Sequence, residues 1–306
     1  MHESLDLAII GGGPAGLTAG LYASRARLNA LLLEQMGPGG QVLLTDWVEN
    51  YPGFPDGLSG YGLVEVFKGH ALRFGLRLET KEVRALRFGR PHVLELADGE
   101  LEAKAVIIAS GARPNRLGVA GEGKLTGKGV SFCATCDGPF YRTQVVAVVG
   151  GGDSAVGEAV YLTRFASKVY VIHRRDTFRA TKVEQERLLA NDKVEVLWDT
   201  VVEAVDGEDR VEGVRLRNLK TREHRRLAVD GLFVYVGIHP NVGFLAPGQL
   251  EADPWGFLMT DEEMRTRAPG VFAAGDVRSK SLRQIANAVG EGAVAAHSAE
   301  KFVSAY

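Results

Sequence analysis

The feature that most constrains the fold of this chain is a strand, glycine turn and helix that occurs twice. Near the amino terminus the apolar run LDLAII is followed at once by GGGPAG and a helical pattern. Further along, VVAVVGGGDSAVGEA repeats the same order. Such a unit binds a dinucleotide, because the tight turn lets the backbone and the helix amino terminus approach a pyrophosphate. We therefore expect two nucleotide-binding units.

The spacing indicates that the two units are copies of one arrangement. Glu34 ends the next strand 23 residues after Gly11, and His173 follows Gly150 by the same 23 residues. One G-x-G-x-x-G pattern is weak support, whereas two in register, each between a strand and a helix, are specific. The expected contact residues are Gly11, Gly13, Pro14, Ala15 and Gly16 in the first copy and Gly150, Gly152, Asp153, Ser154 and Ala155 in the second.

A third repeated pattern marks the domain boundaries. VIIASGARPN and LFVYVGIHPN both run from an apolar strand into G-x-x-P-N. The simplest organisation inserts the second nucleotide domain into the first. We expect an α/β fold of two Rossmann-like, three-layer ββα domains, with residues 1–115 and 240–306 in the first and 116–239 in the second. A turn at Asp98-Gly99 predicts a small antiparallel layer in the first domain.

The two sites differ in charge where the second strand of each copy ends. Glu34 is suited to hydrogen bonds with ribose hydroxyls, whereas guanidinium groups are suited to a 2′-phosphate. The second site is therefore expected to prefer NADPH over NADH by a factor on the order of 10² to 10⁴. A solvated basic strand end is the alternative. The residues concerned are His173, Arg174, Arg175 and Arg179.

The first site, with an acid and no basic cluster, is expected to hold FAD, because a nicotinamide needs a hydride acceptor beside it. The carboxyl-terminal strand in GVFAAGD ends at Gly275 and Asp276. Asp276 is placed to accept a hydrogen bond from a hydroxyl of the cofactor, with a turn or cap residue as the alternative. The helix that begins in RQIANAV would direct its positive end toward the flavin.

The stretch FCATCDG holds both cysteines of the chain. A structural zinc site needs four ligands, and no histidine lies near this stretch, so we predict no metal. Independent buried thiols are an alternative, but the spacing favours a redox disulfide between Cys133 and Cys136. We expect electrons to pass from NADPH to FAD, to this disulfide and then to another disulfide. Asp137 is the candidate proton shuttle, with a solvated turn acid as its alternative.

The predicted positions of these groups require a movement. The cysteine pair and the NADPH fingerprint lie on the same inserted domain, whereas the flavin lies on the other. Nicotinamide and disulfide therefore have to approach the flavin in turn. We expect the inserted domain to rotate about the two G-x-x-P-N joints.

Composition excludes several classes of protein. The formal net charge is −2 and no long run carries one sign, so no nucleic-acid partner is expected. No stretch reaches the roughly 18 apolar residues of a membrane span. The amino terminus carries acids where a signal peptide has positive charge, and we expect a cytoplasmic protein. In a reducing compartment a cysteine pair is more often catalytic or metal-binding than structural.

The chain resembles the low-molecular-weight thioredoxin reductases. GGGPAG, GGQVLLTDWVENYPGFP, ATCDG, GGGDSAVGEA, HRRDTFRA and GVFAAGDV followed by RQ occur in the order typical of that family, from about residue 5 to 300. The resemblance implies a homodimeric FAD enzyme that reduces thioredoxin with NADPH. By the same motifs it implies FAD contacts at Gly40, Gln41, Asn50, Ala109, Gly111, Gly275, Asp276, Arg283, Gln284 and Ile285.

Two other functions stay open at this point. One is a related flavin disulfide reductase that serves a different disulfide carrier. The other is a flavin-binding redox sensor without turnover. The spacing of Cys133 and Cys136 does not decide which sulfur faces the flavin and which attacks the substrate.

Overall fold

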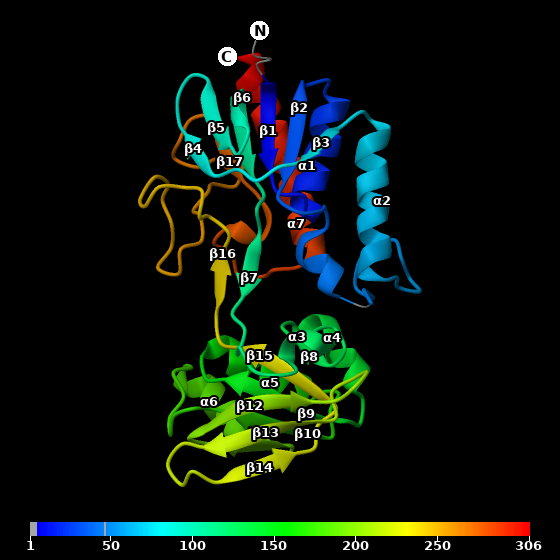
Figure 1. Cartoon of the computed structure of the whole chain (residues 1–306), viewed down its shortest axis with the longest axis vertical. Coiled ribbons are helices and arrows are strands. Elements are labelled where there is room, and N and C mark those ends of the chain that lie inside the picture. The colour runs from blue at the N-terminus through cyan, green and yellow to red at the C-terminus, as the bar shows by residue number, and fades with distance from the viewer. Residues whose placement is uncertain (1–4, 46) are drawn as a thin grey trace. The chain divides into compact units, whose positions relative to one another are not determined.

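A computed structural model describes residues 5–45 and 47–306, and the chain divides into two compact units (Figure 1). Unit 1 consists of Met1–Arg113 and His239–Tyr306, and unit 2 of Pro114–Ile238. Glu3, one of the acids behind the expectation about the amino terminus, lies outside the described residues. Among the described residues, no helix has the length and apolar character needed to span a membrane.

Unit 1 is built on a sheet whose central strands are almost entirely apolar and buried. Its parallel strands, in spatial order, are β3 (Arg77–Thr80), β2 (Ala30–Glu34), β1 (Leu5–Ile10), β6 (Gly99–Ile108) and β17 (Val271–Ala273). Strands buried on both faces carry continuous apolar runs, which is the pattern of LDLAII and ALLLE. The carboxyl-terminal segment therefore returns to pair with β6 beside the amino-terminal half of the chain.

The antiparallel strands β4 (Ala85–Arg87) and β5 (His92–Leu96) extend the same sheet. The predicted antiparallel segment is therefore present, but it is hydrogen-bonded to the main sheet. The antiparallel strands can join the main sheet because β6 is ten residues long. Its first half pairs with β5, and its second half pairs with β1 and β17.

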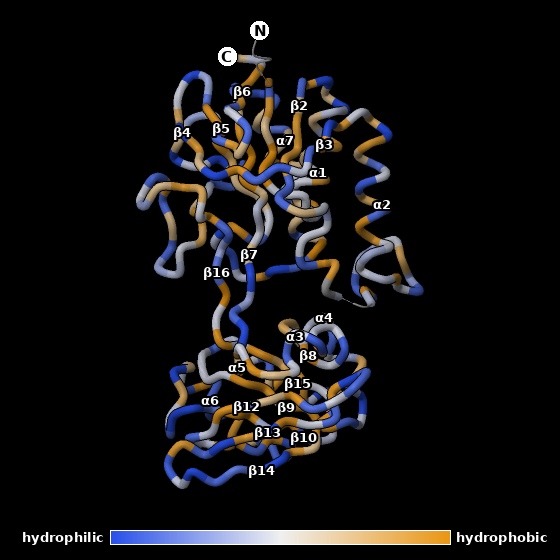
Figure 2. Tube along the Cα trace, in the orientation of Figure 1, coloured by the Kyte–Doolittle hydropathy of each residue, from blue (hydrophilic) through white to orange (hydrophobic). Residues whose placement is uncertain are grey.

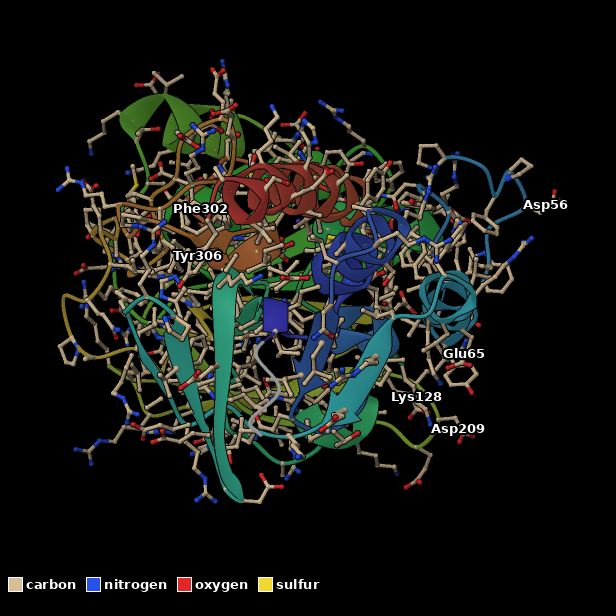
Figure 3. All side chains as sticks on the ribbon, turned by 90° about the horizontal axis from the view of Figure 1, so that it is seen from above. Asp56, Glu65, Lys128, Asp209, Phe302 and Tyr306 are labelled. Atoms are coloured by element: carbon tan, nitrogen blue, oxygen red, sulfur yellow. A yellow bond between two sulfur atoms is a disulfide. The ribbon has the colours of Figure 1, made fainter. Side chains whose placement is uncertain are left out.

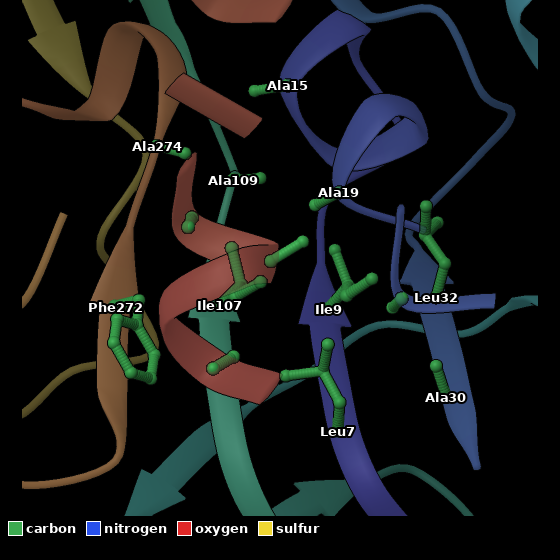
Figure 4. Packing of buried hydrophobic residues seen from close by; sticks show 14 of the residues in the cluster. Leu7, Ile9, Ala15, Ala19, Ala30, Leu32, Ile107, Ala109, Phe272 and Ala274 are labelled. Atoms are coloured by element: carbon green, nitrogen blue, oxygen red, sulfur yellow. The ribbon is translucent and has the colours of Figure 1, made fainter. Parts of the chain in front are cut away.

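Helices cover the sheet of unit 1. They are α1 (Pro14–Arg25), α2 (Gly60–Arg73) and α7 (Ile285–Ser304), with short 3₁₀ segments η1 (Gly40–Leu44) and η3 (Gly275–Val277). Figure 4 shows Ile9 and Ile107 of neighbouring strands packed with Ala19 of α1. At its carboxyl end α7 makes aromatic contacts, and the ring centroids of Phe272 and Phe302 lie 6.5 Å apart. Those of Phe302 and Tyr306, both labelled in Figure 3, lie 6.2 Å apart.

Unit 2 repeats the parallel sheet and adds a second, antiparallel sheet. The parallel strands, in spatial order, are β11 (Val194–Leu197), β10 (Lys168–Ile172), β9 (Val145–Gly150), β15 (Gly231–Tyr235) and β8 (Val130–Ser131). The antiparallel strands are β12 (Thr200–Asp206), β13 (Gly213–Asn218) and β14 (His224–Leu227). The helices are α3 (Glu122–Leu125), α4 (Ala134–Asp137), α5 (Asp153–Leu162) and α6 (Lys182–Leu189), with η2 (Gly138–Tyr141).

The two parallel sheets have the same strand order, so β1, α1, β2 and β6 correspond to β9, α5, β10 and β15. The α/β class with one Rossmann-like unit inserted in the other is therefore confirmed. Each unit has hydrophobic clusters made only of its own residues. Figure 2 shows the hydrophobic runs along the buried strands and the hydrophilic strand β14.

The units are connected by β7 (Ala112–Pro114) and β16 (Ile238–Pro240), which pair with each other (Figure 1). The two G-x-x-P-N copies flank this ribbon symmetrically. Asn241 N donates to Gly111 O and Asn115 N donates to Gly237 O, each at 2.9 Å. Both glycines have positive φ, +70° and +117°, which favours glycine at these corners. The repeated motif thus closes one end of each unit.

Candidate active site

The first glycine fingerprint contains glycines that the fold requires and one that it does not. A Cβ on Gly11 would lie 2.4 Å from Ala109 O, and a Cβ on Gly16 would lie 1.8 Å from Gly11 O. Gly13 has an ordinary φ of −74° and nothing within 4 Å of its Cβ position. The fold therefore tolerates a side chain at Gly13, and the glycine there fits the approach of a phosphate to the amino end of α1.

The second fingerprint shows the same division. Gly150 has a φ of +152°, and its Cβ would lie 2.5 Å from Tyr235 O. Ala155 stands in the third position, with its own Cβ 2.5 Å from that point. Gly152 has a φ of −94° and open space around its Cβ position. Both units therefore leave room at the same place, directly before the helix amino terminus.

The other residues predicted for the first site gather around this loop. Gly39 N donates to Gly12 O at 2.8 Å, and the Cβ position of Gly40 lies 3.6 Å from Gly13 Cα. Across the sheet Ala109 borders Gly11, while Gly275 borders Ala15. The loop thus lies at the carboxyl ends of β1, β6 and β17, where parallel sheets bind their ligands.

Glu34 is part of the same loop. Its carboxylate accepts hydrogen bonds from Gly12 N at 2.7 Å and Met36 N at 3.2 Å. These bonds hold the acid at the end of β2 and tie it to the glycine turn. A carboxylate has further acceptor positions, which leaves Glu34 able to accept a hydrogen bond from a ribose hydroxyl. That contact stays a prediction.

The amides predicted for the first site hold other segments together. Gln41 Nε2 donates to Ala112 O at 2.7 Å, and Asn50 Nδ2 donates to Gln284 Oε1 at 3.1 Å. Gln284 is the residue directly before α7, and Ile285 is its first helical residue. Segments far apart in the sequence are therefore joined beside the predicted flavin site.

Asp276 and Arg283 carry buried polar atoms that fit a ligand. Asp276 Oδ1 and Arg283 Nε have no hydrogen-bond partner among the described residues. Burial raises the pKa of Asp276, while Lys280 and Arg283 act in the opposite direction. Burial also lowers the pKa of Arg283, whose guanidinium carbon lies 4.0 Å from the ring centroid of Phe257. A bound molecule with hydroxyl and acceptor groups would satisfy both atoms.

The cysteine pair forms a disulfide at the start of α4. Cys136 N donates to Cys133 Sγ at 3.2 Å, and Cys133 N donates to Ser131 Oγ at 3.1 Å. Both cysteines and Asp137 are partly exposed. The disulfide is therefore held by backbone hydrogen bonds within residues that are partly exposed, which suits exchange with another disulfide.

Tyr235 connects this disulfide with the second fingerprint. Its hydroxyl accepts a hydrogen bond of 2.6 Å from the backbone N–H of Ala134, the residue after Cys133. Its carbonyl oxygen borders Gly150. Burial raises the pKa of Tyr235, so the phenol stays protonated. One residue of β15 thus contacts both the cysteine segment and the predicted nucleotide loop.

The predicted 2′-phosphate site presents exposed guanidinium groups. Arg174, Arg175 and Arg179 are exposed, and no ion pair joins them to an acid within residues 5–45 and 47–306. The neighbouring acid Asp176 is held by Lys220 at 3.1 Å. The backbone N–H of Arg179 donates to Gly151 O at 2.7 Å, which ties the arginine loop to the glycine turn.

His173 has a different environment from the arginines. Its ring is buried, lies 3.0 Å from Thr177 O through Nε2, and packs beside Phe178 and Trp198. Burial lowers the pKa of His173, which favours the neutral ring. A Cβ on Gly151 would lie 2.2 Å from this ring. His173 therefore connects the glycine and arginine loops, and its direct contact with NADPH stays a prediction.

Three residues close to these sites were missed by the sequence analysis. They are Tyr235, Lys280 and Glu291. Glu291 was detectable in principle, because it is an acid on the face of α7 that also carries the buried residues Ala288, Gly292 and Ala295. Their main contacts join different elements, Tyr235 to the cysteine segment and Glu291 to η3, and sequence spacing alone does not report such contacts.

The fold and the site together define a nucleotide-linked disulfide oxidoreductase. Two Rossmann-like units carry dinucleotide loops of different charge, and the second also holds a partly exposed disulfide. Among the described residues there is no group of three or more His, Cys, Asp or Glu that could hold a metal ion.

Comparisons with known proteins identify the family. The family described as pyridine nucleotide-disulphide oxidoreductase matches residues 5–292. The curated thioredoxin reductase of Treponema pallidum is 45% identical over 305 residues, which cover 99% of this chain and 98% of that protein. The chain belongs to the pyridine nucleotide-disulphide oxidoreductases and, within them, to the thioredoxin reductases. It is thus an oxidoreductase whose cofactors are FAD and NADPH, as predicted.

Solved structures agree with this assignment. A thioredoxin reductase from Streptococcus pyogenes is 46% identical, with a TM-score of 0.95 and complete coverage of both chains. One from Lactococcus lactis, described as being in the FR conformation, is 41% identical. Its TM-score is 0.67, and the match covers 99% of this chain and all of the other.

Proposed function

We propose that this chain is a thioredoxin-disulfide reductase, which takes electrons from NADPH and delivers them through FAD and the Cys133–Cys136 disulfide to oxidised thioredoxin. The observation that carries the proposal is a partly exposed disulfide in the same unit as an arginine-flanked dinucleotide loop. High identity to thioredoxin reductases over the whole chain supports thioredoxin as the acceptor.

Residues 1–115 and 240–306 would form the FAD domain. The open space at Gly13 and the unpartnered atoms of Asp276 and Arg283 fit such a ligand. When bound, FAD supplies a ring that accepts a hydride and passes on two electrons. The residues proposed to hold it are Gly11, Gly13, Pro14, Ala15, Gly16, Glu34, Gly40, Gln41, Asn50, Ala109, Gly111, Gly275, Asp276, Arg283, Gln284 and Ile285.

Residues 116–239 would form the NADPH domain. Gly152 leaves space for the pyrophosphate before α5, and the exposed arginines are free of acid partners within the described chain. Guanidinium groups bind a phosphate through two parallel hydrogen bonds, which would select NADPH. The residues proposed for this site are Gly150, Gly152, Asp153, Ser154, Ala155, His173, Arg174, Arg175 and Arg179.

The cysteine pair would carry out the exchange with the substrate. Two electrons and two protons break the Cys133–Cys136 bond and produce two thiols. One thiolate then attacks the thioredoxin disulfide, and the second cysteine releases the reduced product and restores the original disulfide. Asp137, directly after Cys136, is the proposed group that supplies and removes the protons.

Three further features complete the proposal. Rotation of the inserted domain would let nicotinamide and disulfide reach the flavin in turn, and the two-stranded ribbon β7–β16 is the place for it. The description of the Lactococcus lactis relative as one conformation supports such alternation.

We also propose a homodimer, from the family resemblance, and a cytoplasmic location, because reduced thiols persist in that compartment.

The experiment that tests this function is a coupled assay of the purified protein with NADPH or NADH and a panel of oxidised disulfide proteins. We expect turnover with NADPH and thioredoxin, and much less with NADH. Turnover with a different carrier and none with thioredoxin would contradict the proposed acceptor.

The Cys136→Ser variant tests the electron path. We expect NADPH to bleach the flavin absorbance under anaerobic conditions, because hydride transfer does not need the disulfide. Thioredoxin reduction should fall below detection, because no dithiol can form. If the variant kept full thioredoxin turnover, the path through Cys133 and Cys136 would be wrong.

A further inference from the structure

A largely buried group of charged side chains lies between η3 and the first turns of α7. We call it the η3 charge cluster; its members are Asp276, Arg278, Lys280 and Glu291. Their side chains are 25%, 12%, 9% and 13% exposed. Charged groups are rarely buried unless they are paired, and losing one partner of a buried pair is far more costly than losing a surface pair.

Glu291 is the central acceptor of this cluster. Its Oε1 forms an ion pair with Arg278 Nη1 at 2.8 Å. Its Oε2 accepts from Gly275 N at 2.7 Å and from Lys280 Nζ at 3.1 Å. One carboxylate on α7 therefore holds the backbone of η3 and two cations that follow it.

Lys280 forms ion pairs with two acids and is hydrogen-bonded to only one of them. It is hydrogen-bonded to Glu291, whereas its distance to Asp276 Oδ1 is 3.4 Å. Asp276 Oδ1 is buried and has no hydrogen-bond partner among the described residues. The contact with Lys280 is therefore an ion pair that leaves the acceptor position of this oxygen open.

We propose that Glu291 is a positioning residue for FAD, which retains Lys280 and so keeps Asp276 Oδ1 available to the cofactor. The inference rests on the proposed function, in which Asp276 accepts a hydrogen bond from a cofactor hydroxyl. Without the charge on Glu291, Lys280 has Asp276 as its nearest acid. A charge-assisted hydrogen bond between them would then compete directly with the cofactor.

The test is a titration of apo-protein with FAD, followed by flavin fluorescence. We expect Glu291→Gln to raise the dissociation constant by about 10- to 100-fold, the factor for one hydrogen bond to a charged group. Lys280→Met should bind FAD as tightly as the native chain or more tightly. The double variant should recover most of the affinity lost in Glu291→Gln, because the competing cation is absent.

Matched controls separate positioning from folding and from the function itself. Glu300→Gln changes a more exposed acid on the same helix and should leave FAD affinity unchanged. Circular dichroism of each apo-protein checks that it is folded. The inference is overturned if Glu291→Gln binds FAD normally, or if the double variant binds no better than Glu291→Gln. Native apo-protein that does not bind FAD would instead overturn the proposed flavin site, and normal binding by Asp276→Leu would overturn the role of Asp276 in it.

Discussion

Single residues at the ends of β2 and β10 give the two nucleotide loops opposite charge. Glu34 is bonded to the backbone of its own loop, whereas Arg174, Arg175 and Arg179 are exposed. An exposed guanidinium costs little to desolvate partly and binds phosphate in a fixed geometry. The charge difference was visible in the sequence, because it depends on residue type and on register alone.

Replacing these arginines should change nucleotide preference. We expect Arg175→Gln to lower kcat/KM for NADPH by about 10- to 100-fold, because one charge-assisted phosphate contact is lost. The value for NADH should stay nearly constant, since NADH has no 2′-phosphate. Steady-state kinetics with both nucleotides measure this. Arg187→Gln, at an exposed arginine paired with Glu184, is the control, and an equal loss with both nucleotides would contradict the prediction.

The hydroxyl of Tyr235 should stabilise the cysteine segment. Tyr235→Phe removes the acceptor of the Ala134 N–H, and Ala134 is completely buried. An unsatisfied buried donor costs about 1–3 kcal/mol, so the free energy of unfolding should fall by that amount. Denaturant titration of the oxidised protein measures it, with the exposed Tyr61→Phe as control. Equal stability of both variants would show that the hydrogen bond is dispensable.

At the scale of elements, the two strand–turn–helix copies contain glycines that the packing requires and glycines with open space around them. Gly11 and Gly150 have positive φ. A Cβ on Gly11 would meet Ala109 O, directly after β6, and a Cβ on Gly150 would meet Tyr235 O of β15. Gly16 contacts Gly11 O so closely that a methyl group does not fit, whereas Ala155 shows that the second copy accepts one. The motif alone treats both third positions as equivalent, and only the packing of each helix distinguishes them.

This difference predicts opposite effects of two neighbouring substitutions. Gly16→Ala should lower the free energy of unfolding by about 1–3 kcal/mol or more, because its Cβ would meet a backbone oxygen. Gly13→Ala should change stability by less than about 1 kcal/mol but weaken FAD binding, because the methyl group occupies the phosphate approach. Chemical denaturation of the apo-proteins and FAD titration test the pair. If Gly13→Ala bound FAD normally, the loop would not face the cofactor.

For the η3 charge cluster, the sequence predicted the elements but not the side-chain contacts between them. The strand in GVFAAGD and the helix after RQ were both expected, and they are β17 and α7. Their connection through Glu291 to Gly275, Arg278 and Lys280 was not. Side-chain pairs between a turn and the helix that follows it have no fixed spacing, because they depend on how the two elements pack.

For the whole molecule, the separate cores imply that the inserted unit is able to fold alone. Unit 2 is one continuous segment, and its hydrophobic clusters contain only its own residues. We expect a fragment of residues 114–238 to fold with a cooperative thermal transition, because about 125 residues suffice for a core. Circular dichroism and a titration with NADP⁺ test this. A fragment without a cooperative transition would show that unit 2 needs unit 1.

By itself, the sequence determined the α/β class, the repeated nucleotide-binding unit, the insertion marked by G-x-x-P-N and the cysteine pair. These features are local patterns of residue type and spacing, and each follows from backbone sterics and strand burial. The open space at Gly13 and Gly152, the burial of His173 and the ion pair of Glu291 with Lys280 became visible only in the folded chain. Those facts depend on contacts between separate elements, which form only when each unit packs around its own core.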